Sequence, residues 1–138
     1  MGKQLAVSWI HGDFSPGNIL VSSDTLDVTG IIDWDLAESN ILPQIDLYHL
    51  LLATRMMERS QELGDVVRDL LQGGEWEAYE TAVLQAAQAA LPGETVDNDT
   101  LILLTWLWHV TSTLAKSAQY ATHWLWGPKN LGQVIDSI

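Results

Sequence analysis

The chain has 138 residues, of which 47% are hydrophobic and 17% charged, a balance typical of one globular domain and not of a disordered segment. Eighteen acidic residues against six lysines and arginines give a net charge of −12, so nucleic acid is an unsuitable partner. The absence of cysteine excludes disulfides, thiolate catalysis and cysteine-ligated zinc, and it fits a cytoplasmic protein.

The first predicted elements are short strands. An apolar run at 7–10 leads to two further apolar or β-branched runs at 19–21 and 28–32, and the polar segment 22–27 between them is typical of a turn. The pattern predicts an antiparallel hairpin whose second strand returns to the end at which the first begins. Asp33 should therefore come back beside Asn18.

Helices are predicted for the rest of the chain, with breaks at Gly64, Gly73-Gly74 and Gly127-Pro128. The expected helices span 45 to about 63, 65–72, 75–90, 100 to about 120, and 130–138. Asn98 or Asp99 is expected to cap the fourth. Its apolar stretch at 101–110 is too short to cross a membrane, so we expect a buried helix and no membrane partner.

These elements predict an α+β fold that is mostly helical. We expect residues 1–138 to form a single domain. Within it, residues 1–35 should carry a catalytic loop and a metal-binding hairpin, and residues 43–138 should form a helical subdomain.

Three polar residues in the first quarter of the chain form the strongest functional pattern. Asp13 is followed by Asn18 five residues later and by Asp33 after the predicted hairpin. Phosphoryl transfer from a nucleotide needs a carboxylate to hold the acceptor hydroxyl and oxygen ligands for Mg²⁺. Asp and Asn also build turns, but the complete set in this order favours function over a purely structural role.

The motifs His11-Gly12-Asp13, Pro16-Gly17-Asn18, 30–34 (GIIDW) and 43–46 (PQID) resemble the aminoglycoside phosphotransferase and choline kinase family. The resemblance covers about the first third of the chain and implies the carboxy-terminal lobe of a protein-kinase-like fold. It implies transfer of the γ-phosphoryl group of ATP or GTP to a hydroxyl of a small molecule. An acidic surface favours a cationic acceptor, although it is also explained by solubility alone.

The resemblance also implies a role for individual residues. Asp13 is the catalytic residue, and Asn18 and Asp33 bind Mg²⁺. His11 is expected to brace the backbone near Asp33 and not to transfer a proton. Asp46 should brace the catalytic loop from the start of a helix. For Asp35 two readings stay open, a residue that supports the metal site and a solvated loop acid.

Only ten residues precede His11, whereas the family places a nucleotide-binding lobe before this motif. We therefore expect that lobe to be missing from this sequence and the chain to have little activity alone. The apolar surface left bare should make the chain self-associate as a homo-oligomer.

Two other classes of function stay open. One is a non-catalytic interaction module with a kinase-like shell. The remote one is a non-haem iron oxygenase, in which His11, Asp13 and a later histidine would bind iron. His49 and His109 are expected to be core or groove residues, and most of the tryptophans are expected to pack in the core.

Overall fold

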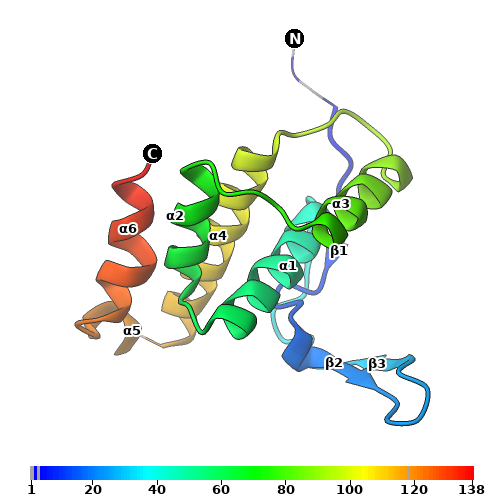
Figure 1. Cartoon of the computed structure of the whole chain (residues 1–138), viewed down its shortest axis with the longest axis horizontal. Coiled ribbons are helices and arrows are strands. Elements are labelled where there is room, and N and C mark those ends of the chain that lie inside the picture. The colour runs from blue at the N-terminus through cyan, green and yellow to red at the C-terminus, as the bar shows by residue number, and fades with distance from the viewer. Residues whose placement is uncertain (1, 3, 118) are drawn as a thin grey trace.

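The computed structural model describes residues 2, 4–117 and 119–138. The fold is α+β and mostly helical, as expected, and it contains two small antiparallel sheets (Figure 1). The strands are β1 (Ser8–Ile10), β2 (Ile19–Val21), β3 (Val28–Ile31) and β4 (Glu38–Ile41). The helices are η1 (Pro16–Asn18), α1 (Gln44–Arg59), α2 (Leu63–Leu71), α3 (Ala78–Ala90), α4 (Asn98–Lys116), α5 (Gln119–Thr122), η2 (Pro128–Gly132) and α6 (Gln133–Ile135).

The predicted hairpin is present. β2 and β3 pair antiparallel, with Ile19 opposite Ile31, so the chain returns to Asn18 as expected. The hairpin projects away from the helices (Figure 1), and most residues of its two strands are exposed. A second pair, β1 with β4, was not predicted. It brings the segment that leads into the catalytic loop against the segment that leads into α1.

The first two helices meet at a different place from the one predicted. α1 ends at Arg59, because Ser60 takes the left-handed conformation (φ 52°). α2 then begins at Leu63, because the side chains of Glu62 and Asp65 form a reciprocal capping box. Gly64, expected to separate two helices, lies inside the first turn of α2. A Cβ atom there would lie 1.8 Å from the carbonyl oxygen of Lys129, so glycine permits a close approach between segments.

Capping side chains also move the later boundaries. Glu77 and Glu80 form a capping box that starts α3 at Ala78. Asp97 caps α4, accepting a hydrogen bond from the backbone N–H of Thr100, so neither Asn98 nor Asp99 is the cap. The extended backbone of Ser117 ends α4 at Lys116, and the expected continuation to residue 120 is replaced by the separate turn α5. At the C-terminus a π-helical segment, η2, precedes the short α6.

The hydrophobic core lies among α1, α2, α4 and α6. It is formed by Tyr48, Leu52, Leu63, Val66, Val67, Leu70, Leu101, Ile102, Trp106, Val110 and Val134. Each fully buried aliphatic side chain contributes about 1.5–3 kcal/mol to folding. Among the tryptophans expected in the core, Trp106 is buried there and its indole N–H donates to the carbonyl of Asn130. Trp124 is exposed.

A buried ion pair attaches α3 to α1. Arg55 and Glu80 are almost fully buried, and the guanidinium donates to both carboxylate oxygens, with Nε 2.7 Å from Oε1. Arg55 also donates to the carbonyl of Glu75 and lies 4.9 Å from the ring centre of Trp76. These interactions satisfy a charge that would otherwise be costly to bury.

Candidate functional site

His11 joins the loop after β1, which contains Asp13, to the end of the hairpin. It follows the buried Ile10 at the end of β1 and is itself buried. Its Nδ1 accepts a hydrogen bond from the backbone N–H of Asp13 (3.3 Å), so the other ring nitrogen, Nε2, carries the proton and donates to the carbonyl of Ile32 (2.8 Å). Ile32 directly precedes Asp33. The imidazole ring thus connects the backbone of Asp13 to the backbone of Ile32 and fixes the distance between them.

Asp46 holds the same loop from the first turn of α1. Its two carboxylate oxygens accept hydrogen bonds from the backbone N–H groups of His11 (2.6 Å) and Gly12 (2.9 Å). A carboxylate that accepts two backbone hydrogen bonds fixes both position and direction of the peptide groups. The loop is therefore set by α1 and not by its own turn alone.

Gly12 allows the loop to pack closely against the segment between β3 and β4. Its φ is +83°, and a Cβ atom would lie 2.2 Å from the carbonyl oxygen of Leu36. Only glycine adopts this conformation without strain and fits this space. From the other side, the indole N–H of Trp108 on α4 donates to the carbonyl of Gly12 (2.8 Å).

The three residues of the phosphoryl-transfer pattern lie next to one another. The side-chain amide of Asn18 donates to the carbonyl of Asp13 (2.9 Å), and the backbone N–H of Ile32 donates to the carbonyl of Asn18 (3.0 Å). Asp33 is the next residue and has a left-handed backbone (φ 61°), which turns the chain out of the hairpin. Asp33 and Asp35 are both exposed in the segment after β3.

The chemistry of this group suits Mg²⁺. The Asn18 amide nitrogen is engaged with Asp13, which leaves its Oδ1 as the free end of the side chain. Together with the Asp33 carboxylate it offers hard oxygen ligands, which Mg²⁺ prefers. Two protein ligands leave most coordination positions to water or to nucleotide phosphates, so affinity for the free ion should be weak.

Two histidines, from helices that are far apart in the sequence but packed together in the fold, lie against Asp13. His49 comes from α1 and His109 from α4, with ring centres 5.2 Å apart. His49 Nε2 lies 3.9 Å from Asp13 Oδ1. Burial, and after it the neighbouring His109, lowers the pKa of His49 to about 4 against the opposing effect of Asp13. Burial also lowers the pKa of His109, so both rings are neutral at pH 7.

Reasoning from the sequence missed these histidines as neighbours of the site. His49 lies three residues after Asp46, so the two share a face of α1, and this spacing was the available signal. No local sequence pattern predicts that His109 or Trp108 lies near Asp13, because the packing of α4 against α1 brings both residues to the loop. His11, expected to join Asp13 in the oxygenase reading, has both ring nitrogens engaged with backbone groups.

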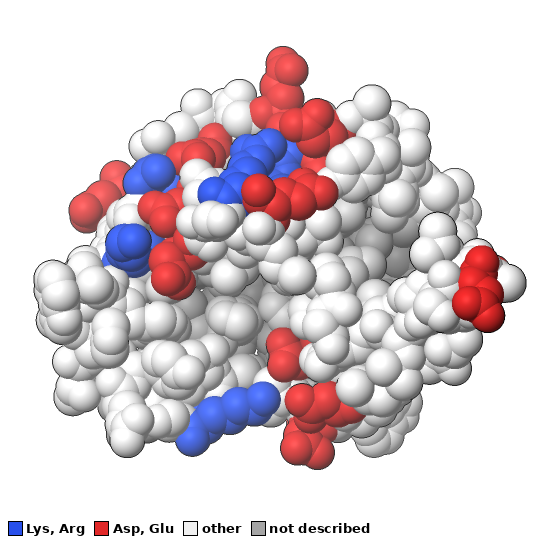
Figure 2. Space-filling view, turned by 60° about the horizontal axis from the view of Figure 1, so that its bottom comes forward, with Lys and Arg blue, Asp and Glu red and all other residues white. Residues whose placement is uncertain are grey.

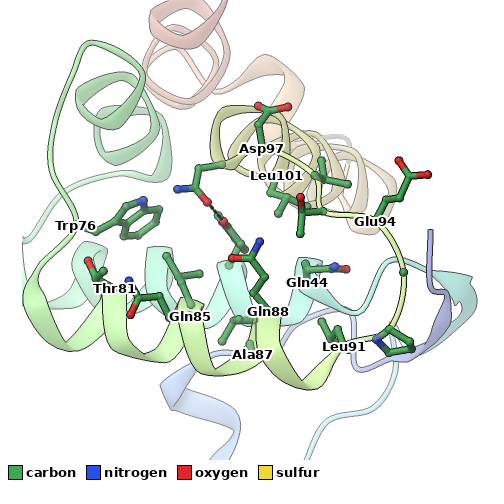
Figure 3. A pocket seen from close by; sticks show the side chains of 18 residues that line it. Gln44, Trp76, Thr81, Gln85, Ala87, Gln88, Leu91, Glu94, Asp97 and Leu101 are labelled. Atoms are coloured by element: carbon green, nitrogen blue, oxygen red, sulfur yellow. Dashed lines mark hydrogen bonds between the residues drawn. The ribbon is translucent and has the colours of Figure 1, made fainter. Parts of the chain in front are cut away.

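A cavity lies elsewhere on α1. It has a volume of about 410 Å³ and is bounded by α1, α3 and the segment that leads into α4. In Figure 3, Gln88 from α3 points into it below Asp97 and Leu101, and Gln85 lies beside it on the same helix. Burial, followed by the charges of Asp97 and Asp99, raises the pKa of Tyr48 to about 12, and its hydroxyl donates to Asn98. The lining does not include Asp13, Asn18 or Asp33.

Charge is mixed on the face shown in Figure 2, where the basic side chains of the described residues lie mostly among acidic ones. Ion pairs among the described residues include Arg59–Glu77 and Arg68–Asp69. Among the described residues, none of the helices combines the length and apolar character needed to cross a membrane.

A family model described as the phosphotransferase enzyme family matches residues 2–95, which is more than half of the chain. The chain therefore belongs to this family. Comparisons with curated proteins and with solved structures give no significant match. The matched region contains the catalytic loop, the hairpin and α1, and it ends before α4. Trp108 and His109 thus come from a part of the chain outside the family match.

Proposed function

We propose that this phosphotransferase moves the γ-phosphoryl group of ATP or GTP, held with Mg²⁺, to a hydroxyl group of a small molecule. The observation that carries the proposal is the pair of hydrogen bonds that link Asp13 to Asn18 and Asn18 to the residue before Asp33. They hold the backbone of Asp13 and the backbone before Asp33 next to Asn18, which supports a site made of one acceptor-binding carboxylate and two oxygen ligands for a metal ion. Family membership supports the class of reaction.

In this proposal Asp13 accepts a hydrogen bond from the substrate hydroxyl and directs it toward the γ-phosphorus. Positioning supplies most of the effect, because the transition state is loose and needs little base strength. Asn18 and Asp33 would hold Mg²⁺, which neutralises charge on the phosphate oxygens when bound. His11 and Asp46 keep the loop in place through the backbone, and Asp35 is available as an outer acidic residue.

We further propose that turnover requires a nucleotide-binding lobe besides the elements described here. The described residues before His11 form β1 and the short segment leading to it. Nothing in this segment offers a loop that covers phosphates. The acceptor class is open among aminoglycosides, choline, sugars and similar alcohols, and the net charge of −12 favours a cationic one. A cytoplasmic location belongs to the same proposal, since the sequence has no cysteine.

The test is phosphoryl transfer by the complete enzyme, which is this chain together with the proposed nucleotide-binding lobe. The reaction is followed by ³¹P NMR with ATP or GTP and a panel of these alcohols. The proposal predicts a phosphomonoester that appears only with an acceptor and Mg²⁺ and disappears when EDTA is added. Nucleotide binding without transfer to any alcohol would favour the non-catalytic interaction module instead.

A further inference from the structure

Asp13, His49 and His109 form a compact cluster of potential metal ligands. One ligand atom from each residue can be chosen so that all three lie within 4.8 Å of one another. The three come from the catalytic loop, α1 and α4, so the packing of the fold assembles them. Asn18 and Asp33, the oxygen pair assigned to Mg²⁺ above, are not part of this cluster.

The ring of His49 is buried and makes no hydrogen bond to the described residues through its Nδ1. The relative exposure of His49 is 4%. No hydrogen bond at Nδ1 therefore fixes the ring, while its other nitrogen, Nε2, faces Asp13 with Oδ1 3.9 Å away. The other two members are accessible: the Asp13 side chain is 30% exposed and His109 is half-buried. An ion can reach the cluster from the side of Asp13.

We propose that Asp13, His49 and His109 bind a divalent transition-metal ion, of which Zn²⁺ is the representative. Two imidazoles and one carboxylate form the ligand set that proteins use for Zn²⁺ in sites with an open position. Imidazole suits Zn²⁺, whereas Mg²⁺ prefers oxygen, so the two ions select different parts of this region. Around tetrahedral Zn²⁺ the ligand atoms lie about 3.3 Å apart, so the side chains must close by at most about 1.5 Å.

The consequence of occupancy rests on the proposed function. A bound ion takes the Asp13 carboxylate, which can then no longer accept the hydrogen bond of the substrate hydroxyl. Zn²⁺ would thus act as an inhibitor that competes with the acceptor and not with Mg²⁺. Because His109 lies outside the family match, this form of control would be a property of chains that carry both histidines.

Titration calorimetry on the tag-free chain with Zn²⁺ alone tests the site, with Co²⁺ absorption spectroscopy as a second readout. We expect one Zn²⁺ per chain and a tetrahedral Co²⁺ spectrum. His109→Gln and Asp13→Asn, both at accessible side chains, should each weaken binding at least about tenfold. His123→Gln is the matched control, since His123 is exposed and its Nδ1 accepts from the backbone of Trp126. It should bind as the unchanged chain does.

Equal affinity in His109→Gln and in the control, or loss in all three variants alike, would overturn the site. Circular dichroism of each variant shows that the comparison is between folded chains. Zn²⁺ binding is measured without nucleotide, so its result does not depend on whether the enzyme transfers a phosphoryl group. For inhibition, the ratio of turnover with and without Zn²⁺ is compared between the complete enzyme and its His109→Gln variant. An equal ratio would refute control by this site.

Discussion

Asp46 Oδ2 accepts a 2.6 Å hydrogen bond from the backbone N–H of His11, across 35 residues of sequence. The start of α1 and the loop that contains Asp13 therefore form one unit. Because the carboxylate also receives the N–H of Gly12, its removal leaves two backbone donors without their acceptor.

Asp46→Ala should lower the free energy of unfolding by about 3 kcal/mol, since each hydrogen bond to a charged group is worth about 1.5–3 kcal/mol. Asp46→Asn should lose less, because one oxygen is retained. Urea unfolding measures both. Asp24→Asn, in the exposed turn of the hairpin, is the control and should stay within about 0.5 kcal/mol of the unchanged chain. A similar effect at positions 24 and 46 would contradict the bracing role.

Gly64→Ala tests the contact between α2 and η2. The new Cβ would meet the carbonyl of Lys129, 1.8 Å away, so helix and segment must separate. We expect overpacking to lower the free energy of unfolding by about 1–3 kcal/mol. Gly132→Ala is the matched control, because nothing lies within 4 Å of its Cβ and alanine favours a helix by about 1 kcal/mol. Thermal unfolding should show opposite shifts for the two variants, and shifts of the same sign would disprove the contact.

The Arg55–Glu80 pair should make stability depend on pH in the acidic range. Burial alone would raise the pKa of Glu80, but the hydrogen bond from Arg55 lowers it below the ordinary value of 4.5. The unfolded chain then binds more protons than the folded one, so this contribution is present above pH 4.5 and lost as pH falls below it. Glu80→Gln should remove that part of the pH dependence.

At neutral pH, Glu80→Gln should also cost about 3–5 kcal/mol, because it leaves the buried guanidinium unpaired. Urea unfolding at several pH values measures both effects. Glu77→Gln, whose ion pair with Arg59 is exposed, should change stability by less than about 1 kcal/mol. Equal losses of unfolding free energy in Glu80→Gln and Glu77→Gln would show that the buried ion pair contributes no more than the exposed one.

Self-association is expected from the apolar side chains on β1 and the hairpin. Trp9, Leu26 and Val28 are more than 60% exposed. Light scattering should give a mass above 15.3 kDa that rises with concentration. Val28→Lys should shift the equilibrium to the monomer, whereas Trp124→Lys, an exposed residue beyond α5, should not. A monomer at all micromolar concentrations would exclude the oligomer.

Local signals in the sequence were sufficient for the hairpin and for the convergence of Asn18 and Asp33. Strand register follows from a short turn and two apolar runs. The boundary between α1 and α2 was wrong, because it depends on Ser60 in a left-handed conformation and on an acidic capping box. His49 and His109 were not assigned to the site, since sixty residues separate them and only the packing of α1 on α4 brings them together. Long-range packing of this kind leaves no local pattern.

In the proposed function, Asp13 acts on the acceptor while Asp33 holds the metal-bound nucleotide. The most direct measurement compares turnover and Mg²⁺–nucleotide affinity for Asp13→Ala and Asp33→Ala in the complete enzyme. Asp13→Ala should reduce turnover by about 100-fold or more and leave nucleotide affinity nearly unchanged, whereas Asp33→Ala should damage both. Small and equal effects of the two substitutions on turnover and on nucleotide affinity would contradict these roles of Asp13 and Asp33.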